Sequence, residues 1–207
     1  MSKRKHWESV YHSKASNAVS WYSPHLDTSL QFIEATGLNH AAQIIDVGGG
    51  ASTLVDDLLD RGYQNLTVVD LATSALAVTR QRLGAKGVNV TWLAGDITEL
   101  SLPAKHYDLW HDRAVFHFLT TDEQRRAYIQ RVCSAVKDGG HVVIATFGPH
   151  GPAECSGLPV ARYSGAELHG LFGQPFVLVS QATQEHATPW GTTQEFVYCC
   201  CLKQGAC

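Results

Sequence analysis

Residues 43–52 read QIIDVGGGAS: an apolar run, one acid, three glycines and the start of a helical pattern. The apolar run predicts a buried strand. Glycines let the backbone turn tightly and approach a ligand closely, and the helix that follows presents free N–H groups to that ligand. A carboxylate at Asp46 would repel phosphates, so the loop favours a cofactor that carries a positive charge in their place.

A nicotinamide dinucleotide is the obvious competitor for such a loop. Its fingerprint has a glycine at the sixth position of Gly-x-Gly-x-x-Gly. Counting from Gly48, that position is Thr53. Together with the acid two residues before Gly48, this argues against a pyrophosphate-containing cofactor and hence against a nicotinamide oxidoreductase.

The composition of the 207 residues is that of one globular domain: 44% are hydrophobic, 17% are charged and the net charge is −3. The sixteen Lys and Arg are scattered, so no nucleic-acid partner is expected. Residues 1–8 have no apolar core after their charges, and no apolar run approaches membrane-spanning length. These features predict a soluble, cytoplasmic protein with no membrane partner. They leave its oligomeric state open.

The cysteines include no Cys-x-x-Cys pair, so no structural metal site is expected. Residues 196–202 (FVYCCCL) read as a buried terminal strand in which Cys199, Cys200 and Cys201 pack as small apolar side chains. Whether Cys155 or the Cys199–Cys201 run binds a soft metal or metalloid stays open.

Apolar, β-rich runs alternate with helical patterns, which predicts βαβ units and a mostly parallel sheet. The expected parallel strands are residues 43–47, 66–70, 88–93, 107–111 and 141–147. The expected helices are residues 52–61, 74–83 with Ser74 as the cap, 122–136 ending at Gly139-Gly140, a short one at 166–172, and one or two within 6–36. Residues 176–180 and 195–202 should close the sheet as an antiparallel hairpin.

The pattern predicts a single domain over residues 1–207. It divides into an N-terminal helical cap at 1–40, a cofactor-binding core at 41–147, a substrate lid loop at 148–165 and a closing hairpin region at 166–207.

Three acids stand at the ends of the first three expected strands: Asp46, Asp70 and Asp96. In an open parallel sheet, ligands bind outside the carboxyl ends of the strands. Asp70 suits two ribose hydroxyls, and Asp96 can accept from an adenine amino group. Asp46 can orient the glycine loop or reach a cationic amino group.

The motifs DVGGG at 46–50, VD at 69–70 and GDI at 95–97 resemble those of the class I (Rossmann-like) S-adenosylmethionine-dependent methyltransferases. The resemblance covers roughly residues 40–147. It implies an α/β three-layer sandwich whose seven-stranded, mostly parallel sheet ends in a C-terminal antiparallel hairpin, with S-adenosyl-L-methionine as cofactor. The residues expected to bind this cofactor are Asp46, Gly48, Gly49, Gly50, Asp70, Leu71, Asp96, Ile97 and Asp112.

The fourth strand should end at the methyl group, where residues 110–118 read WHDRAVFHF. His111 is a candidate general base, because histidine titrates near neutral pH. Asp112 is a candidate to hold the cofactor's amino group or a cationic substrate. Arg113 is a candidate to hold a substrate carboxylate or oxyanion. His117 is a second candidate base, but its place between two phenylalanines favours a structural role.

The same segment partly resembles the Asp-Lys-Gly-x-x-Asp stretch of protein-lysine methyltransferases that act on elongation factors. Arg113 stands for the lysine, Ala114 for the glycine and His117 for the second acid. Residues 6–11 (HWESVY) resemble the start of that subgroup.

Residues 148–163 hold three prolines and follow the fifth strand, so they should form a loop that can fold over the methyl-transfer point. The loop carries His150, Cys155, Arg162 and Tyr163. Trp21 and Tyr22 could close the other side.

These features favour a methyltransferase whose acceptor is a small molecule with a nucleophilic N, O, S or heavier chalcogen or metalloid atom, rather than a protein. A protein-lysine methyltransferase is one alternative. A non-catalytic, S-adenosylmethionine-binding regulatory module is another. The identity of the acceptor and the use of a general base stay open.

Overall fold

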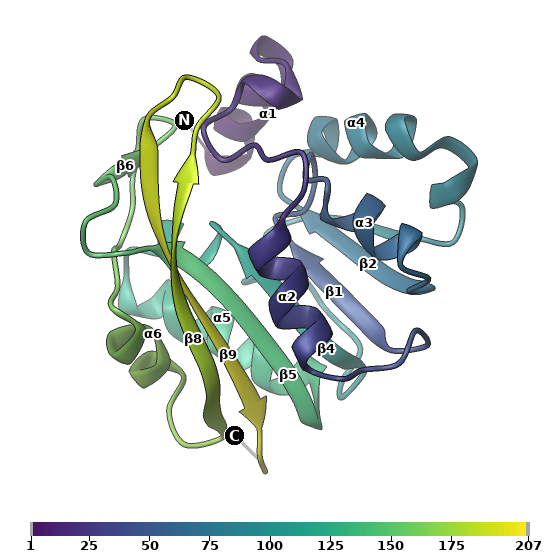
Figure 1. Cartoon of the computed structure of the whole chain (residues 1–207), viewed down its shortest axis with the longest axis vertical. Helices are drawn as coiled ribbons and strands as arrows, with labels where there is room; N and C mark the ends of the chain where they lie inside the picture. The colour runs from purple at the N-terminus through teal and green to yellow at the C-terminus, as the bar shows by residue number, and fades with distance from the viewer. Residues whose placement is uncertain (1, 206–207) are drawn as a thin grey trace.

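One seven-stranded sheet organises the protein, whose computed structural model describes residues 2–205 (Figure 1). The strands lie in the order β3-β2-β1-β4-β5-β9-β8. Strands β1 to β5 are parallel, whereas β9 and β8 run antiparallel at one edge, so the expected fold class is confirmed. Their bounds are β1 Gln43–Val47, β2 Asn65–Asp70, β3 Thr91–Ala94, β4 Tyr107–Arg113, β5 Val136–Phe147, β8 Phe176–Ala187 and β9 Thr193–Lys203. A separate small ribbon pairs β6 (Glu154–Cys155) with β7 (Leu158–Pro159).

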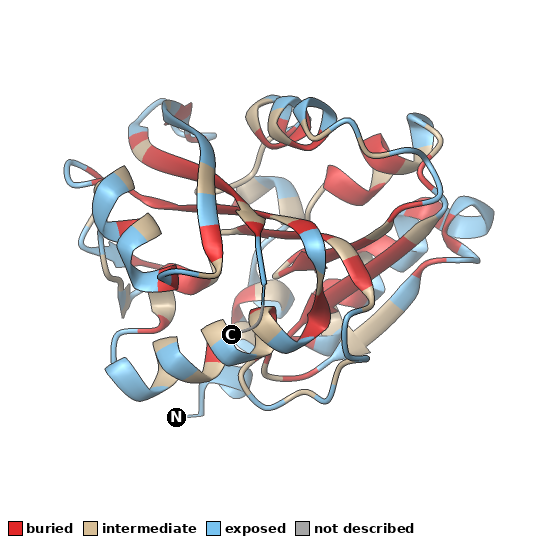
Figure 2. Ribbon diagram, turned by 90° about the horizontal axis from the view of Figure 1, so that it is seen from below, coloured by how far each residue is buried: buried red, intermediate tan, exposed pale blue. Residues whose placement is uncertain are grey.

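Helices cover both faces of this sheet. The α-helices are α1 Lys3–Ser13, α2 Asp27–Ala35, α3 Leu54–Asp60, α4 Thr73–Leu83, α5 Asp122–Ala135 and α6 Gly165–Phe172. Side chains of α2, α3 and α4 form one apolar core with the sheet, and those of α5 and α6 form a second core on the opposite face. Buried residues therefore concentrate in the strands between two helical layers (Figure 2). No helix within residues 2–205 is both long and apolar enough to span a bilayer.

Several strand boundaries differ from the expectation: β2, β4, β8 and β9 are longer than expected, and β3 and β5 begin elsewhere. Strand β3 begins at Thr91, because residues 84–87 form a 3-10 turn (η2) and Val88 is 79% exposed. Strand β5 begins at Val136, immediately after α5, and continues through Gly139-Gly140. Those glycines had suggested the end of a helix, but Val136 pairs with Tyr107 of β4, so strand pairing overrides the local signal.

The cap of α4 also differs from the expectation. Ala72 is the N-cap residue and Ser74 lies inside the first turn. The carboxylate of Glu8, on α1, accepts hydrogen bonds from the N–H groups of Thr73 (2.7 Å) and Ser74 (3.2 Å). A negative charge at a helix N-terminus is favourable, so this contact holds α1 against α4.

The turn after β4 is held by a buried chain of hydrogen bonds. Trp110 donates to the Tyr128 hydroxyl (2.8 Å), which donates to the Asp112 carboxylate. Asp112 also accepts from the backbone N–H groups of Val115 (2.9 Å) and Phe116 (3.1 Å). Burial raises the pKa of Asp112 to about 6, with the hydrogen bond from Tyr128 opposing this rise. This series of hydrogen bonds connects α5 to the sheet and fixes the path of the backbone after Arg113.

Replacing Tyr128 by Phe is expected to lower the free energy of unfolding by about 1–3 kcal/mol, because Trp110 and Asp112 each lose a buried partner. Urea titration followed by circular dichroism measures this change. Tyr63→Phe is the control, since the Tyr63 hydroxyl makes no hydrogen bond within residues 2–205; we expect a change within about 0.5 kcal/mol. An equal loss of unfolding free energy in the two variants would contradict the stabilising role of these buried hydrogen bonds.

Candidate active site

A cavity opens at the carboxyl ends of β1 to β4. Its empty space is about 820 Å³ when the open solvent at its mouth is included. Val47, Gly48, Asp70 and Asp96 line it from the strand ends, and α1 covers it. A second chamber, of about 450 Å³ with its open mouth included, adjoins it beside the glycine loop. We call these the larger chamber and the smaller chamber.

The side chains around residues 48–50 leave no room for anything larger than glycine. Gly48 has φ +74°, and a Cβ there would lie 2.1 Å from the Val115 side chain. A Cβ on Gly49 would lie 2.1 Å from Asp46 Oδ2, and one on Gly50 would lie 2.5 Å from Asp70 Oδ2. A side chain at Gly49 or Gly50 would displace an acid that flanks the loop, and one at Gly48 would displace Val115. The bare backbone of the loop can therefore form a cradle for a ligand.

Asp70 is a buried acceptor in the larger chamber. Its Oδ1 accepts from the Ala72 N–H (2.8 Å) and its Oδ2 from the Gly50 N–H (3.1 Å). Burial raises the pKa of Asp70 to about 6, and these two hydrogen bonds oppose the rise. The remaining lone pairs of the carboxylate suit hydroxyl donors from a ligand.

Asp96 lies on the same wall with Leu71 and Ile97. Its Oδ1 accepts from the backbone N–H (2.9 Å) and the hydroxyl (2.7 Å) of Thr98. Its second oxygen is not used by these bonds. The wall therefore offers an apolar surface and one hydrogen-bond acceptor. A flat nucleobase that carries an amino group would need both.

Asp46 and His111 meet in the smaller chamber. His111 Nδ1 lies 2.7 Å from Asp46 Oδ1, and Nε2 lies 2.9 Å from the Ser29 hydroxyl. Both ring nitrogens are thus occupied and the residue is 1% exposed, which does not suit a general base. Asp46 Oδ2, by contrast, is buried without a hydrogen-bond partner among the described residues. A buried acceptor of this kind calls for a donor from a ligand.

Arg113 lies between the two chambers and lines both. Its Nε donates to the Tyr198 hydroxyl (3.1 Å), and a terminal nitrogen donates to the Trp21 carbonyl (3.0 Å). Its guanidinium carbon lies 4.2 Å from the centre of the Phe196 ring. All of these partners are uncharged.

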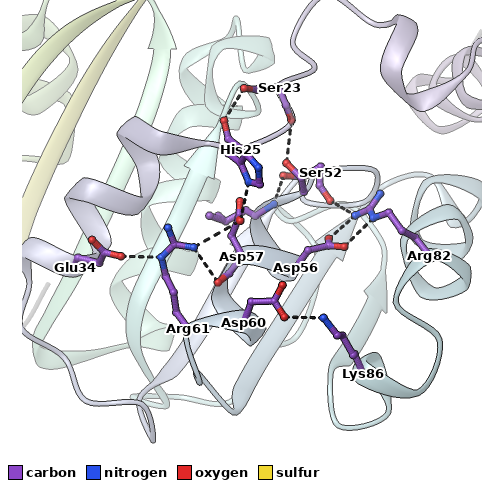
Figure 3. Close-up of polar contacts among 12 residues, drawn as sticks. Ser23, His25, Glu34, Ser52, Asp56, Asp57, Asp60, Arg61, Arg82 and Lys86 are labelled. Atoms are coloured by element: carbon purple, nitrogen blue, oxygen red, sulfur yellow. Dashed lines mark hydrogen bonds and ion pairs between the residues drawn. The ribbon is translucent and has the colours of Figure 1, made fainter.

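The segment that carries Trp21 and Tyr22 is anchored to α3, the helix after the glycine loop (Figure 3). The Thr53 hydroxyl donates to the Ser23 carbonyl (3.0 Å), and His25 Nδ1 lies 2.9 Å from Asp57 Oδ1. Further ion pairs join α3 to its neighbours: Asp56 with Arg82, and Asp60 with Lys86. The wall formed by Trp21 and Tyr22 is therefore positioned by the same helix that positions the loop.

Helix α1 contributes cavity residues that the sequence did not indicate: Lys3, Trp7 and Tyr11. The Trp7 ring centre lies 5.7 Å from that of Trp21 and 5.1 Å from that of Phe118. The signal that could have found them is the pair of aromatic residues four positions apart, which share one face of a helix.

The loop at 148–163 contributes one residue to the cavity, Cys155. Burial raises the pKa of its thiol to about 11. His150 is exposed and its backbone N–H donates to Glu195, while Arg162 donates to the Pro149 and Gly151 carbonyls. Tyr163 packs against Phe116. His150, Arg162 and Tyr163 therefore lie outside the cavity lining, because their contacts hold the loop to the sheet edge.

Asp112 also departs from the expectation. Its carboxylate faces Tyr128 and the turn after β4, is fully buried and lines neither chamber. The alternation of side chains along β4 explains this, since Asp112 points to the face opposite that of its neighbours His111 and Arg113.

Residues 44–140 match a protein family described as a methyltransferase domain. The chain is 24% identical over 119 residues to the eEF1A lysine and N-terminal methyltransferase of Mus musculus, covering 58% of this chain and 17% of that protein. It is 24% identical over 123 residues to EEF1A lysine methyltransferase 2 of Danio rerio, covering 56% of this chain and 53% of that protein. The chain thus spans about half, or much less, of the length of these relatives.

Solved structures share the fold. One comes from work on the conversion of a disulfide bond into a thioacetal group during echinomycin biosynthesis; its TM-score is 0.80 at 18% identity, covering 97% of this chain and 93% of that one. Another is the 1,6-didemethyltoxoflavin-N1-methyltransferase of Burkholderia thailandensis with bound 1,6-didemethyltoxoflavin and S-adenosylhomocysteine; its TM-score is 0.72 at 21% identity, covering 98% and 87%. The domain match, the relatives and the shared fold together support a class I, S-adenosylmethionine-dependent methyltransferase.

Proposed function

We propose that the protein transfers the methyl group of S-adenosylmethionine to a small nucleophilic acceptor. The observation that carries this proposal is the unpartnered, buried Oδ2 of Asp46 beside the glycine loop. It suits an ammonium donor such as the one at the methionine end of this cofactor. Gly48 and Arg113 line both chambers, so a ligand bound beside them would extend from one into the other.

The residues that would hold the cofactor differ in the donor that each accepts. Asp70 would take the ribose hydroxyls, and Asp96 would take the adenine amino group against Leu71 and Ile97. The cradle of Gly48, Gly49 and Gly50 would let the backbone approach the ligand. His111 would act as a positioning residue, because it holds Asp46 through Oδ1 and leaves Oδ2 free. When bound, the cofactor supplies a methyl group activated by its sulfonium charge.

The side chains around the larger chamber favour a small molecule as the acceptor. Trp7, Tyr11, Trp21 and Phe118 line it as aromatic rings, and Cys155 closes one side. Because burial raises the pKa of its thiol, Cys155 stays protonated near neutral pH and acts as an apolar wall. An acceptor with an apolar or aromatic body would fit such walls, and the covering helix α1 would exclude water from it.

A protein amine is the second candidate acceptor. It is favoured by the names of the curated relatives in mouse and zebrafish and by the resemblance of residues 6–11 to that subgroup. The aromatic rings that line the larger chamber could surround an ammonium side chain.

A transfer assay with methyl-labelled cofactor separates the two candidates. The purified protein is incubated with a panel of small thiols, phenols, carboxylic acids and amines, and in parallel with cell protein. We expect label in a small-molecule product. Label confined to a protein band would favour the second candidate, and failure to bind S-adenosylhomocysteine would overturn both.

Asp70→Asn is expected to weaken S-adenosylhomocysteine binding by about 1–3 kcal/mol at pH 7. In the wild type, the ionised carboxylate accepts from the ligand and has a pKa of about 6 without it. Affinity should therefore rise about tenfold from pH 5 to pH 7 and then level off. The Asn variant should lose this rise. Isothermal titration calorimetry measures both effects, with the surface variant Asp60→Asn as control. An unchanged pH dependence in Asp70→Asn would contradict the assignment.

Asp46→Asn tests the ammonium site. The amide can keep the contact with His111 but has no charge, so S-adenosylhomocysteine affinity should fall by about 1–3 kcal/mol. Binding of 5′-methylthioadenosine, which lacks the amino-acid end, should change little. Calorimetry on both ligands gives the comparison; equal losses for the two would mean that Asp46 supports the loop without contacting the amino group.

A further inference from the structure

We propose that the acceptor is a small weak acid that binds as its anion beside Arg113 in the larger chamber and is methylated at the anionic atom. This inference rests on the proposed function and names its substrate class. The observation behind it is a half-buried guanidinium whose partners are all neutral.

The surroundings of Arg113 leave its charge uncompensated. Tyr198, Trp21 and Phe196 hold the guanidinium through a hydroxyl, a carbonyl and a ring face. Among residues 2–205 no carboxylate lies within ion-pair distance of it. Charged groups removed from water are ordinarily paired, so the site is completed by an anion that the described chain does not supply.

The titratable groups near Arg113 do not supply that anion. Besides Tyr198, which accepts a hydrogen bond from Arg113, the groups whose pKa responds to its charge are His117, His186 and Cys155, from η3 (Phe116–Phe118), β8 and β6. Burial, aided by the charge of Arg113, lowers the pKa of both histidines, that of His117 to about 3. Burial keeps the Cys155 thiol protonated. All three groups are neutral near pH 7.

The guanidinium borders the larger chamber as well as the smaller one. Cys155 lines only the larger chamber, and the charge of Arg113 slightly opposes the rise that burial causes in the pKa of its thiol. The other cation of this chamber, Lys3, donates only to the Phe118 carbonyl among the described residues. Two cations without acidic partners therefore border the space left for the acceptor.

Among residues 2–205, the larger chamber offers the acceptor no general base that the cofactor would leave free. Apart from Asp70 and Asp96, which would serve the cofactor, its titratable residues are Lys3, Tyr11, Arg113 and Cys155. Burial raises the pKa of Tyr11 well above its usual value, so its hydroxyl stays protonated. The histidine of the adjoining chamber has both nitrogens occupied. The acceptor must therefore present a lone pair without losing a proton to the protein.

An anion meets this requirement. Its lone pair forms the new bond to the methyl carbon, the carbon–sulfur bond breaks with its electron pair going to sulfur, and no proton moves. A nearby guanidinium lowers the pKa of a bound thiol, phenol or carboxylic acid and so favours the reactive form. The aromatic walls suit a flat apolar body for that acid.

The first test measures binding without turnover. Benzoate and its neutral isostere benzamide are titrated calorimetrically into the S-adenosylhomocysteine complex. Wild type should bind benzoate at least about tenfold more tightly than benzamide, and Arg113→Gln should abolish this preference. Arg162→Gln is the control, because that arginine contacts loop carbonyls outside the cavity and should keep the preference. No preference in the wild type, or a preference kept in Arg113→Gln, overturns the inference.

The same titrations distinguish a role of Arg113 toward the cofactor. If Arg113 held the carboxylate of the methionine end, Arg113→Gln would weaken S-adenosylhomocysteine but leave 5′-methylthioadenosine unchanged. We expect both affinities to change less than about threefold. A selective loss for S-adenosylhomocysteine overturns the inference and leaves the proposed function standing.

The second test measures transfer to thiophenol, which ionises near neutral pH, and to aniline, which reacts as a neutral amine. The wild type should favour thiophenol, its rate should rise with the ionisation of the thiol, and Arg113→Gln should lower only this rate, by about tenfold or more. Preference for aniline, or transfer only to protein, overturns the inference while the methyltransferase activity stands. Absence of transfer to every acceptor would instead count against the proposed function.

Discussion

The buried contact between Asp46 and His111 joins the two central strands at the point where the chain leaves them. The two residues are partners in the parallel register of β1 and β4, and their side chains meet at 2.7 Å. Two positions beyond Asp46 comes Gly48, and two beyond His111 comes Arg113. The register of β1 and β4 therefore sets the distance between the glycine cradle and Arg113. Neither strand can slip along the other without separating Asp46 from His111.

Contacts between segments far apart in the chain build the rest of the site around this pair. Glu8 holds α1 to the start of α4, and His25 and Ser23 hold the Trp21 segment to α3. Neither contact uses an apolar core residue. The aromatic cover of the larger chamber thus depends on a few polar bonds near its rim, whereas the floor depends on the packed sheet.

The parts of the fold that sequence patterns predicted well are those with local causes. The apolar runs of β1 and β2, the three glycines and the acids at strand ends follow from periodicity and turn chemistry. The errors have non-local causes. Ser74 was displaced as a cap by a carboxylate 66 positions away, and Gly139-Gly140 entered β5 because β4 was there to pair with it.

The candidate site divides in the same way. Asp46, Gly48, Asp70 and Asp96 were predicted because a parallel sheet brings its strand ends to one edge, which is a property of the chain pattern. Which polar atoms are free was not predictable. Asp112 accepts a hydrogen bond from Tyr128, and both ring nitrogens of His111 are hydrogen-bonded, to Asp46 and Ser29. Asp46 Oδ2 has no hydrogen-bond partner, and Arg113 has no ion-pair partner, among the described residues. Hydrogen-bond partners such as Ser29 and Tyr198 lie 82 and 85 positions away, so only the folded arrangement determines which groups can meet a ligand.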